Sequence, residues 1–211
     1  MRHQGMLALL LVVPCALLCL ERTPVRAAAR EPVFVGAQAC GKCHDGPGMG
    51  HQYSKWLLSR HARAYASLSL PEARPIADLS GIPGDPHDSP MCLGCHATGS
   101  DVEPWRRDAT FRLADGVQCE MCHGAGSEYM EMAVMKDRQA AMMAGLMMPT
   151  KQSCTRCHYV KGSHAAVHKR PQIDIEMAWK KLAHPTPQKA PAEAPAAGAG
   201  KAAPPAGPKY V

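Results

Sequence analysis

Hydrophobic and polar positions along the chain predict a small number of helices separated by long irregular stretches. Apolar positions at helical spacing predict a helix over 52–70, ended by Pro71. A second helix is predicted over 128–144, with Gly145 as its C-cap, and a third over 174–183. The third has Asp174 as N-cap. We therefore expect a mainly α fold with extensive irregular loops.

The remaining stretches predict loops. Residues 74–90 are rich in Pro, Gly and Asp and predict a loop that leaves His87 exposed. Residues 33–35 form a short extended apolar patch. After 184 the composition changes to Pro, Ala and Gly, which predicts a disordered tail over 185–211.

Residues 1–29 have the pattern of a secretory signal peptide. A basic start is followed by an apolar run over 6–20 and by small residues at 27–29. The run is shorter than the roughly 20 residues that span a bilayer, so we favour cleavage over a membrane anchor. The folded domain is then 30–184, and we expect a periplasmic or exported location. The outer surface of the cell stays open as a further location.

One chemical motif occurs four times. Each copy is Cys-x-x-Cys-His, the attachment signature for a c-type haem in an exported protein. Two thiols form thioethers to one porphyrin, and the histidine becomes the proximal iron ligand. The copies comprise Cys40, Cys43 and His44; Cys92, Cys95 and His96; Cys119, Cys122 and His123; and Cys154, Cys157 and His158.

Other interpretations of these cysteines are weaker. A zinc site, a redox dithiol or a disulfide needs paired cysteines, but none requires histidine directly after each pair. The chain has 10 cysteines, of which Cys15 and Cys19 lie within 1–29 and the other eight all belong to the motifs. No thiol remains for a disulfide or a nucleophile, so we expect four covalently bound c-type haems.

Composition agrees with this expectation. Aromatic residues make up 5% of the chain, with only two Phe, so a core built of protein alone would be thin. Four macrocycles would supply the missing apolar volume. The formal net charge of +6 comes without a dense basic run or a recognition motif, so we expect no nucleic-acid partner.

Several side chains are candidates for the distal, second axial ligand of these haems. His61 lies on the apolar face of the 52–70 helix with Leu57, Ala64 and Leu68, and His184 ends the 174–183 helix. His164 and His168 are four residues apart. Met135 belongs to a second stripe, Met132, Met135, Met142 and Leu146. This stripe has two interpretations: adaptable packing against haem edges, or a thioether ligand that would raise a potential.

Residues 38–184 resemble the cytochrome c554 family of tetrahaem electron carriers. The resemblance rests on the order of the four motifs, on Trp56 five residues before His61, and on Cys-Leu-Gly-Cys-His over 92–96. It rests also on Gly-Val-Gln-Cys-Glu-Met-Cys-His-Gly-Ala-Gly over 116–126. The resemblance implies that His61 and His184 are distal ligands and that the haem on His96 has the open sixth position.

The chain departs from that family at one ligand. The family's third distal histidine follows the third motif by about a dozen residues, where this chain offers tyrosine and methionines. His51, His164, His168 or Met135 are the substitutes that remain open.

We expect an electron carrier that accepts electrons from one redox protein and delivers them to another. Two alternatives stay open. One is a reductase of nitric oxide, nitrite or hydroxylamine at a five-coordinate haem, and the other is a subunit of a conductive filament. Homo-oligomerisation and association with a membrane or cell surface also stay open.

Overall fold

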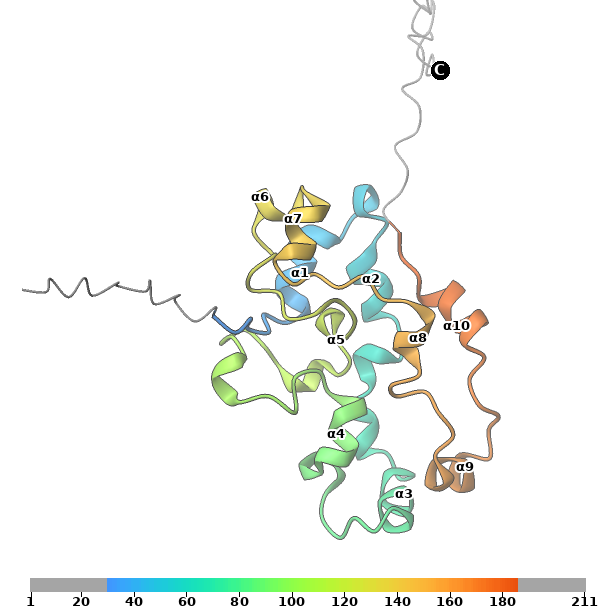
Figure 1. Cartoon of the computed structure of the whole chain (residues 1–211). Coiled ribbons are helices and arrows are strands. Elements are labelled where there is room, and N and C mark those ends of the chain that lie inside the picture. Colours follow the sequence, from blue (N-terminus) through green and yellow to red (C-terminus); the bar gives the residue numbers. More distant parts are fainter. Residues whose placement is uncertain (1–29, 186–211) are drawn as a thin grey trace, which may run out of the picture. The chain divides into compact units, whose positions relative to one another are not determined.

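The computed structural model describes residues 30–185. The predicted signal peptide, 1–29, and nearly all of the predicted tail, 186–211, lie outside the described residues. Residues 31–185 belong to one compact unit (Figure 1).

Within 30–185 the fold is helical, with short helices and no strand. One isolated bridge pairs Phe34 with Arg107. This confirms the predicted mainly α class with extensive loops. The helices are α1 Ala37–His44, α2 Gln52–Leu57, α3 Ala73–Leu79, α4 Pro90–His96, α5 Cys119–His123, α6 Met132–Met135, α7 Arg138–Met143, α8 Lys151–Cys154, α9 Gly162–His168 and α10 Ile175–Leu182. Short 3₁₀ turns lie between several of them.

The short helices follow from the motifs themselves. A Cys-x-x-Cys-His unit in helical conformation places its two thiols and its histidine on one side of the turn, because residues three and four apart share a face. The first three motifs end α1, α4 and α5, and each of these helices stops at the motif histidine. The fourth motif begins where α8 ends, at Cys154.

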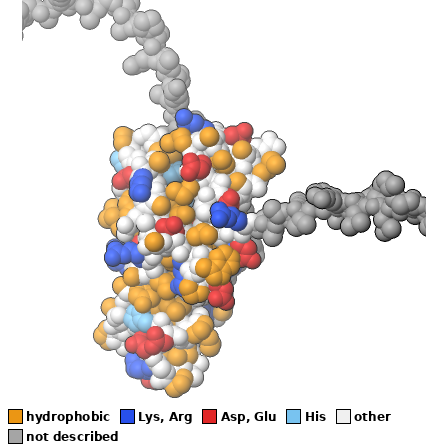
Figure 2. Space-filling model, turned by 90° about the vertical axis from the view of Figure 1, so that its left-hand side faces the viewer, with side chains coloured by type: hydrophobic (Ala, Val, Ile, Leu, Met, Phe, Trp, Pro, Cys, Tyr) orange, Lys and Arg blue, Asp and Glu red, His pale blue; other side chains and the backbone are white. Residues whose placement is uncertain are grey.

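The protein core is small, as the composition predicted. Its buried apolar side chains are Val35, Ala37, Trp56, Leu68, Ala77, Ala97, Val117, Tyr129 and Ala141. Many larger apolar side chains have no protein partner that covers them. Leu58 is 77% exposed and Met143 is 83% exposed, and apolar side chains are spread over the face shown in Figure 2.

A buried polar network takes the place of a larger apolar core beside α1 and α5. The Glu120 carboxylate accepts backbone N–H groups from Val35, Gly36 and Gly126, each at 2.8 Å. The Gln118 side chain accepts from the Ala37 N–H at 2.7 Å. These bonds tie the residues before the first motif to the third motif, about 80 residues later in the chain.

Trp56 completes the network from α2. Its indole N–H donates to the Val117 carbonyl oxygen at 2.7 Å, which joins α2 to the chain before α5. The Thr98 hydroxyl accepts from the Gln118 N–H at 2.8 Å. Buried polar groups with all partners present fix one arrangement of the backbone.

Two predicted long helices are wrong. The 52–70 helix is α2 followed by 3₁₀ turns at His61–Arg63 and Ala66–Ser69. The Ser59 hydroxyl accepts from the His61 N–H at 3.2 Å, and such local side-chain bonds compete with helix continuation. The 128–144 helix is split into α6 and α7, because Asp137 caps α7 by accepting from the N–H groups of Gln139 and Ala140.

The predicted loop over 74–90 is also wrong in part, since it contains most of α3. Pro75 lies in the first turn of that helix, where proline is tolerated. Arg74 pairs with Asp78 one turn later at 2.6 Å. The predicted 174–183 helix is confirmed as α10, with Asp174 accepting from the Met177 N–H as N-cap.

Candidate haem-binding site

Three of the four motif histidines lie close to a second imidazole. The ring centres of His158 and His61 are 5.9 Å apart, those of His123 and His184 are 6.2 Å apart, and those of His96 and His164 are 6.5 Å apart. In each pair the partners come from different elements. The chain therefore brings together histidines up to 97 residues apart, counting from His61 to His158.

These separations match two imidazoles on opposite sides of one metal ion. With a metal–nitrogen bond of about 2.0–2.1 Å and a ring centre about 1.1 Å beyond the nitrogen, the two centres lie about 6.3 Å apart. A direct hydrogen bond between rings would bring them closer than a shared metal does. The three pairs thus have the spacing of proximal and distal ligands.

Hydrogen bonds at Nδ1 orient three of the motif imidazoles. The Nδ1–H of His96 donates to the Ala64 carbonyl at 2.8 Å, and that of His123 donates to the Met147 carbonyl at 3.0 Å. The Nδ1–H of His44 donates to the Gln52 side-chain oxygen at 2.6 Å. Because Nδ1 is engaged in each ring, Nε2 is the nitrogen left for iron, which is the usual role of such partners around a metal.

Burial keeps these rings neutral. Loss of solvent lowers the pKa of five imidazoles, those of His61, His96, His123, His158 and His164. A neutral imidazole has the free lone pair that a metal requires. The rings are therefore in the ligating form at neutral pH.

The thiols of different motifs lie close together. A thiol hydrogen bond from Cys40 to Cys119 raises the pKa of Cys40 and lowers that of Cys119. Burial raises the pKa of Cys157 to about 11, and the neighbouring Cys95 thiol adds to this rise. The first motif therefore adjoins the third, and the second adjoins the fourth.

Further contacts join the motifs. The Gln52 side chain bridges His44 and the His184 carbonyl, to which it donates at 2.9 Å. The Lys161 ammonium lies 3.5 Å from the Cys95 sulfur, three residues after His158. Burial raises the pKa of the Cys122 thiol, and the nearby Cys154 thiol adds to it, so the third motif also adjoins the fourth.

The residues present fit haem better than zinc. Structural zinc needs four protein ligands at one point, whereas a haem iron takes four nitrogens from its porphyrin and only two ligands from protein. Within 30–185 no three His, Cys, Asp or Glu side chains converge on a metal position. Paired imidazoles beside paired thiols are the donor set that a covalently bound haem requires.

The remaining candidates have different surroundings. His51 is exposed, with φ 53°, at the start of α2. His168 is exposed at the end of α9, with its ring centre 6.3 Å from that of His164. Met135 is half-buried at the end of α6. Within the described residues no ring lies opposite His44 as His61, His164 and His184 lie opposite the other motif histidines.

One smaller expectation is wrong. His87 is not exposed: its side chain is 21% accessible. The ring nitrogens contact the Asp85 carboxylate at 3.0 Å and the Ser69 hydroxyl at 3.3 Å. Tyr65 packs edge-on against the same ring.

Two residues of the site escaped sequence reasoning. Gln52 holds His44 and the chain at His184 together, and no spacing rule pointed to it. Glu120 lies inside the third motif, and the chain segment that it binds begins 85 residues earlier at Val35. A carboxylate between two motif cysteines, with glycines on either side of the motif, was the only local signal of its role.

The helical fold and the thiol–imidazole sites have the features of a c-type cytochrome, a protein with covalently bound haem. Comparison with family models gives a match over part of the chain: residues 39–124 match the model described as cytochrome c554 and c-prime. This region is similar to that family. The match contains the first three motifs and ends at Gly124, before the fourth. No curated protein and no solved structure matches the chain.

One further property bears on the protein's surroundings. Among the helices of residues 30–185, none has the length and apolar character needed to cross a bilayer.

Proposed function

We propose that the chain is an exported tetrahaem cytochrome that passes electrons from one redox protein to another. The observation that carries this proposal is the set of three opposed histidine pairs, each containing one motif histidine. The fourth haem follows from the fourth motif, which repeats the attachment residues of the other three.

Two imidazole ligands favour electron transfer over chemistry on a substrate. Bound haem supplies a one-electron couple at its iron. The opposed histidines His61 and His158 would occupy both axial positions and hold the same coordination in both oxidation states. Little rearrangement then opposes transfer. The role of His61 and His184 as distal ligands, implied by the family resemblance, is part of this proposal.

The contacts between motifs suggest a path for electrons. The first motif adjoins the third through Cys40 and Cys119, and the third adjoins the fourth through Cys122 and Cys154. The fourth adjoins the second through Lys161 and Cys95. We expect electrons to pass in the order first, third, fourth and second motif, or the reverse, with donor and acceptor docking at the two ends.

Export is supported by the pattern of 1–29 and by the attachment chemistry, because haem is coupled to such thiols outside the cytosol. The partners would be redox proteins with no nucleic acid involved. Oligomerisation, filament formation and association with a membrane or cell surface stay predictions from the sequence.

An anaerobic redox titration of the mature holoprotein, followed by visible spectra, tests the proposal. We expect all haem to be reduced and reoxidised reversibly, with exchange of four electrons per chain. Nitric oxide, nitrite and hydroxylamine are then offered one at a time to the reduced protein. Sustained catalytic consumption of any of them would overturn the carrier function in favour of the reductase.

A further inference from the structure

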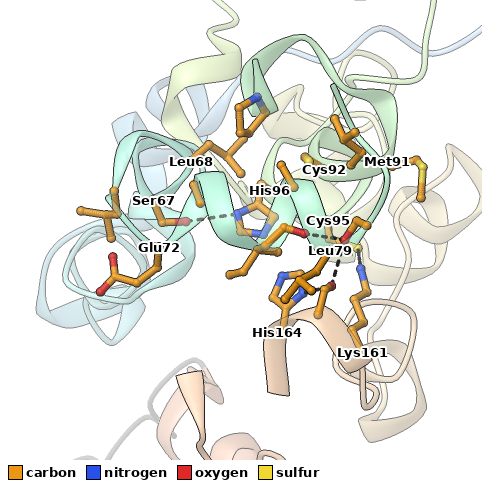
Figure 3. Close-up of a pocket in the computed structure, with 18 of the residues that line it drawn as sticks. Ser67, Leu68, Glu72, Leu79, Met91, Cys92, Cys95, His96, Lys161 and His164 are labelled. Atoms are coloured by element: carbon orange, nitrogen blue, oxygen red, sulfur yellow. Dashed lines mark hydrogen bonds between the residues drawn. The ribbon is translucent and has the colours of Figure 1, made fainter. Parts of the chain in front are cut away.

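A cavity of about 610 Å³ lies beside the second motif. Cys92, Cys95 and His96 line it from α4, and His164 lines it from α9. Leu68 and Ala77 add apolar walls. Its size falls in the range of about 300–1,000 Å³ typical of cofactor sites. Figure 3 shows the two histidines pointing into the same space.

His96 is oriented toward this cavity by its own hydrogen bonds. Its Nδ1 is 2.8 Å from the Ala64 carbonyl oxygen and 3.2 Å from the Ser67 hydroxyl. Nε2 is therefore the free nitrogen. The ring centre of His164 lies 6.5 Å from that of His96, close to the separation expected for ligands on opposite sides of one iron.

His164 is held in place by contacts from distant parts of the chain. The Ser80 hydroxyl donates to the Ser163 hydroxyl at 2.9 Å, which anchors α9 against the end of α3. Lys161, just before α9, contacts the Cys95 sulfur at 3.5 Å. All four residues of these two contacts line the cavity, so both contacts hold α9 beside it.

The first motif lacks such a partner. His44 donates to Gln52, and within 30–185 no imidazole is paired with its ring. His51, the histidine nearest to it in sequence, is exposed and precedes α2 in the left-handed conformation.

We infer that His164 is the sixth ligand of the haem held by His96, and that the iron open to an added small ligand is the one held by His44. This inference rests on the proposed tetrahaem function and assigns its ligands. It reverses the implication of the family resemblance, which placed the open position on the second motif.

The test uses the holoprotein, reduced under anaerobic conditions and titrated with carbon monoxide, which binds ferrous haem where a position is free or weakly held. We expect wild type to bind one equivalent per chain. His164→Ala should bind two equivalents and show one additional high-spin haem in the ferric state. His168 also lines the cavity, so His168→Ala discriminates between the two histidines of α9: this variant should bind one equivalent, as wild type does.

A second variant covers the case in which His164→Ala does not mature. His164→Met keeps a ligand on the same side, so it should remain low-spin and raise the potential of one haem, since a methionine ligand favours the ferrous state. An unchanged redox titration for this variant would overturn the assignment of His164.

The other outcomes separate the inference from the proposed function. One equivalent of carbon monoxide bound by both wild type and His164→Ala would remove His164 from the ligand set. No binding by wild type would show the His44 iron to be closed. If the intact mass of the wild-type protein accounts for fewer than four bound haems, the tetrahaem function on which the inference rests is overturned instead.

Discussion

Two regions of this chain are built in different ways. Residues 31–124, the N-terminal region, contain a buried hydrogen-bond network around Glu120, Gln118 and Thr98 and most of the buried apolar side chains. Residues 125–185, the C-terminal region, contain only two of the buried apolar side chains, Tyr129 and Ala141. No residue of 142–185 is buried. Yet the second region supplies His158, His164 and His184 to the opposed pairs.

The difference indicates two sources of order. The N-terminal region has contacts of its own to set its backbone, and it is the region that matches the family model. The C-terminal region has little protein core to offset the entropy of ordering its chain. We infer that haem binding, through its thioethers and axial histidines, supplies most of the free energy that orders this second region.

Removing the fourth attachment site should have the largest effect. In the double variant Cys154→Ala with Cys157→Ala, we expect amide protection over 142–185 to fall to the level of an open chain, while 31–124 stays protected. Hydrogen exchange resolved by peptide measures both regions in one experiment.

A matched control for that experiment is Arg156→Ala, because Arg156 is exposed and lies between the two thiols without replacing either. This variant should retain wild-type protection throughout. Persistent protection over 142–185 in the thiol variant would mean that the C-terminal region folds on its own packing.

The next largest effect should come from Glu120, in the N-terminal region. Glu120→Ala leaves three buried N–H groups without an acceptor, those of Val35, Gly36 and Gly126. We expect the free energy of unfolding to fall by about 3–5 kcal/mol. Urea unfolding measures this change, with exposed Glu131→Ala as the control. A loss below about 1 kcal/mol would show that the network does not hold this region together.

A smaller, more local change should follow at the contact between the regions. His61 comes from the N-terminal region and faces His158 of the C-terminal region at 5.9 Å. His61→Ala should convert one of the haems from low-spin to high-spin while the chain stays folded. Ferric electron paramagnetic resonance measures the change. His51→Ala, at an exposed position, should leave the spectrum unaltered.

The smallest effect should come from the cap of α10, which precedes His184. Asp174→Ala removes the acceptor for the Met177 N–H and should reduce protection of that helix by about 1 kcal/mol. Hydrogen exchange over 175–182 measures it. If haem ligation by His184 orders this helix, the spin states stay as in wild type, whereas loss of a low-spin haem would show that the cap positions the ligand.

Sequence reasoning recovered what is encoded locally. The four motifs are contiguous, and the Asp174 cap with the apolar face behind it located α10. The prediction of one helix over 52–70 was wrong because the Ser59 hydroxyl accepts from the His61 N–H, and this local hydrogen bond competes with continuation of the helix. Periodicity depends only on the spacing of apolar and polar residues, so it contains no information about such a hydrogen bond.

The pairing of ligands could not be predicted in the same way. His164 reaches the second motif only because Ser80 and Cys95 hold the chain around α9, and those contacts are 83 and 66 residues apart in sequence. Glu120 likewise acts on the chain at Val35 and Gly36. Such long-range contacts are set by the packing of the whole domain, which local patterns do not contain.

We expect every one of the four motifs to carry a covalently bound haem. Intact mass spectrometry of the mature protein under denaturing conditions tests it most directly, because thioether-linked haem stays with the chain when noncovalent haem is lost. We expect the mass of the processed polypeptide plus four haems. A mass equal to the bare polypeptide, or to the polypeptide with fewer than four haems, would contradict it.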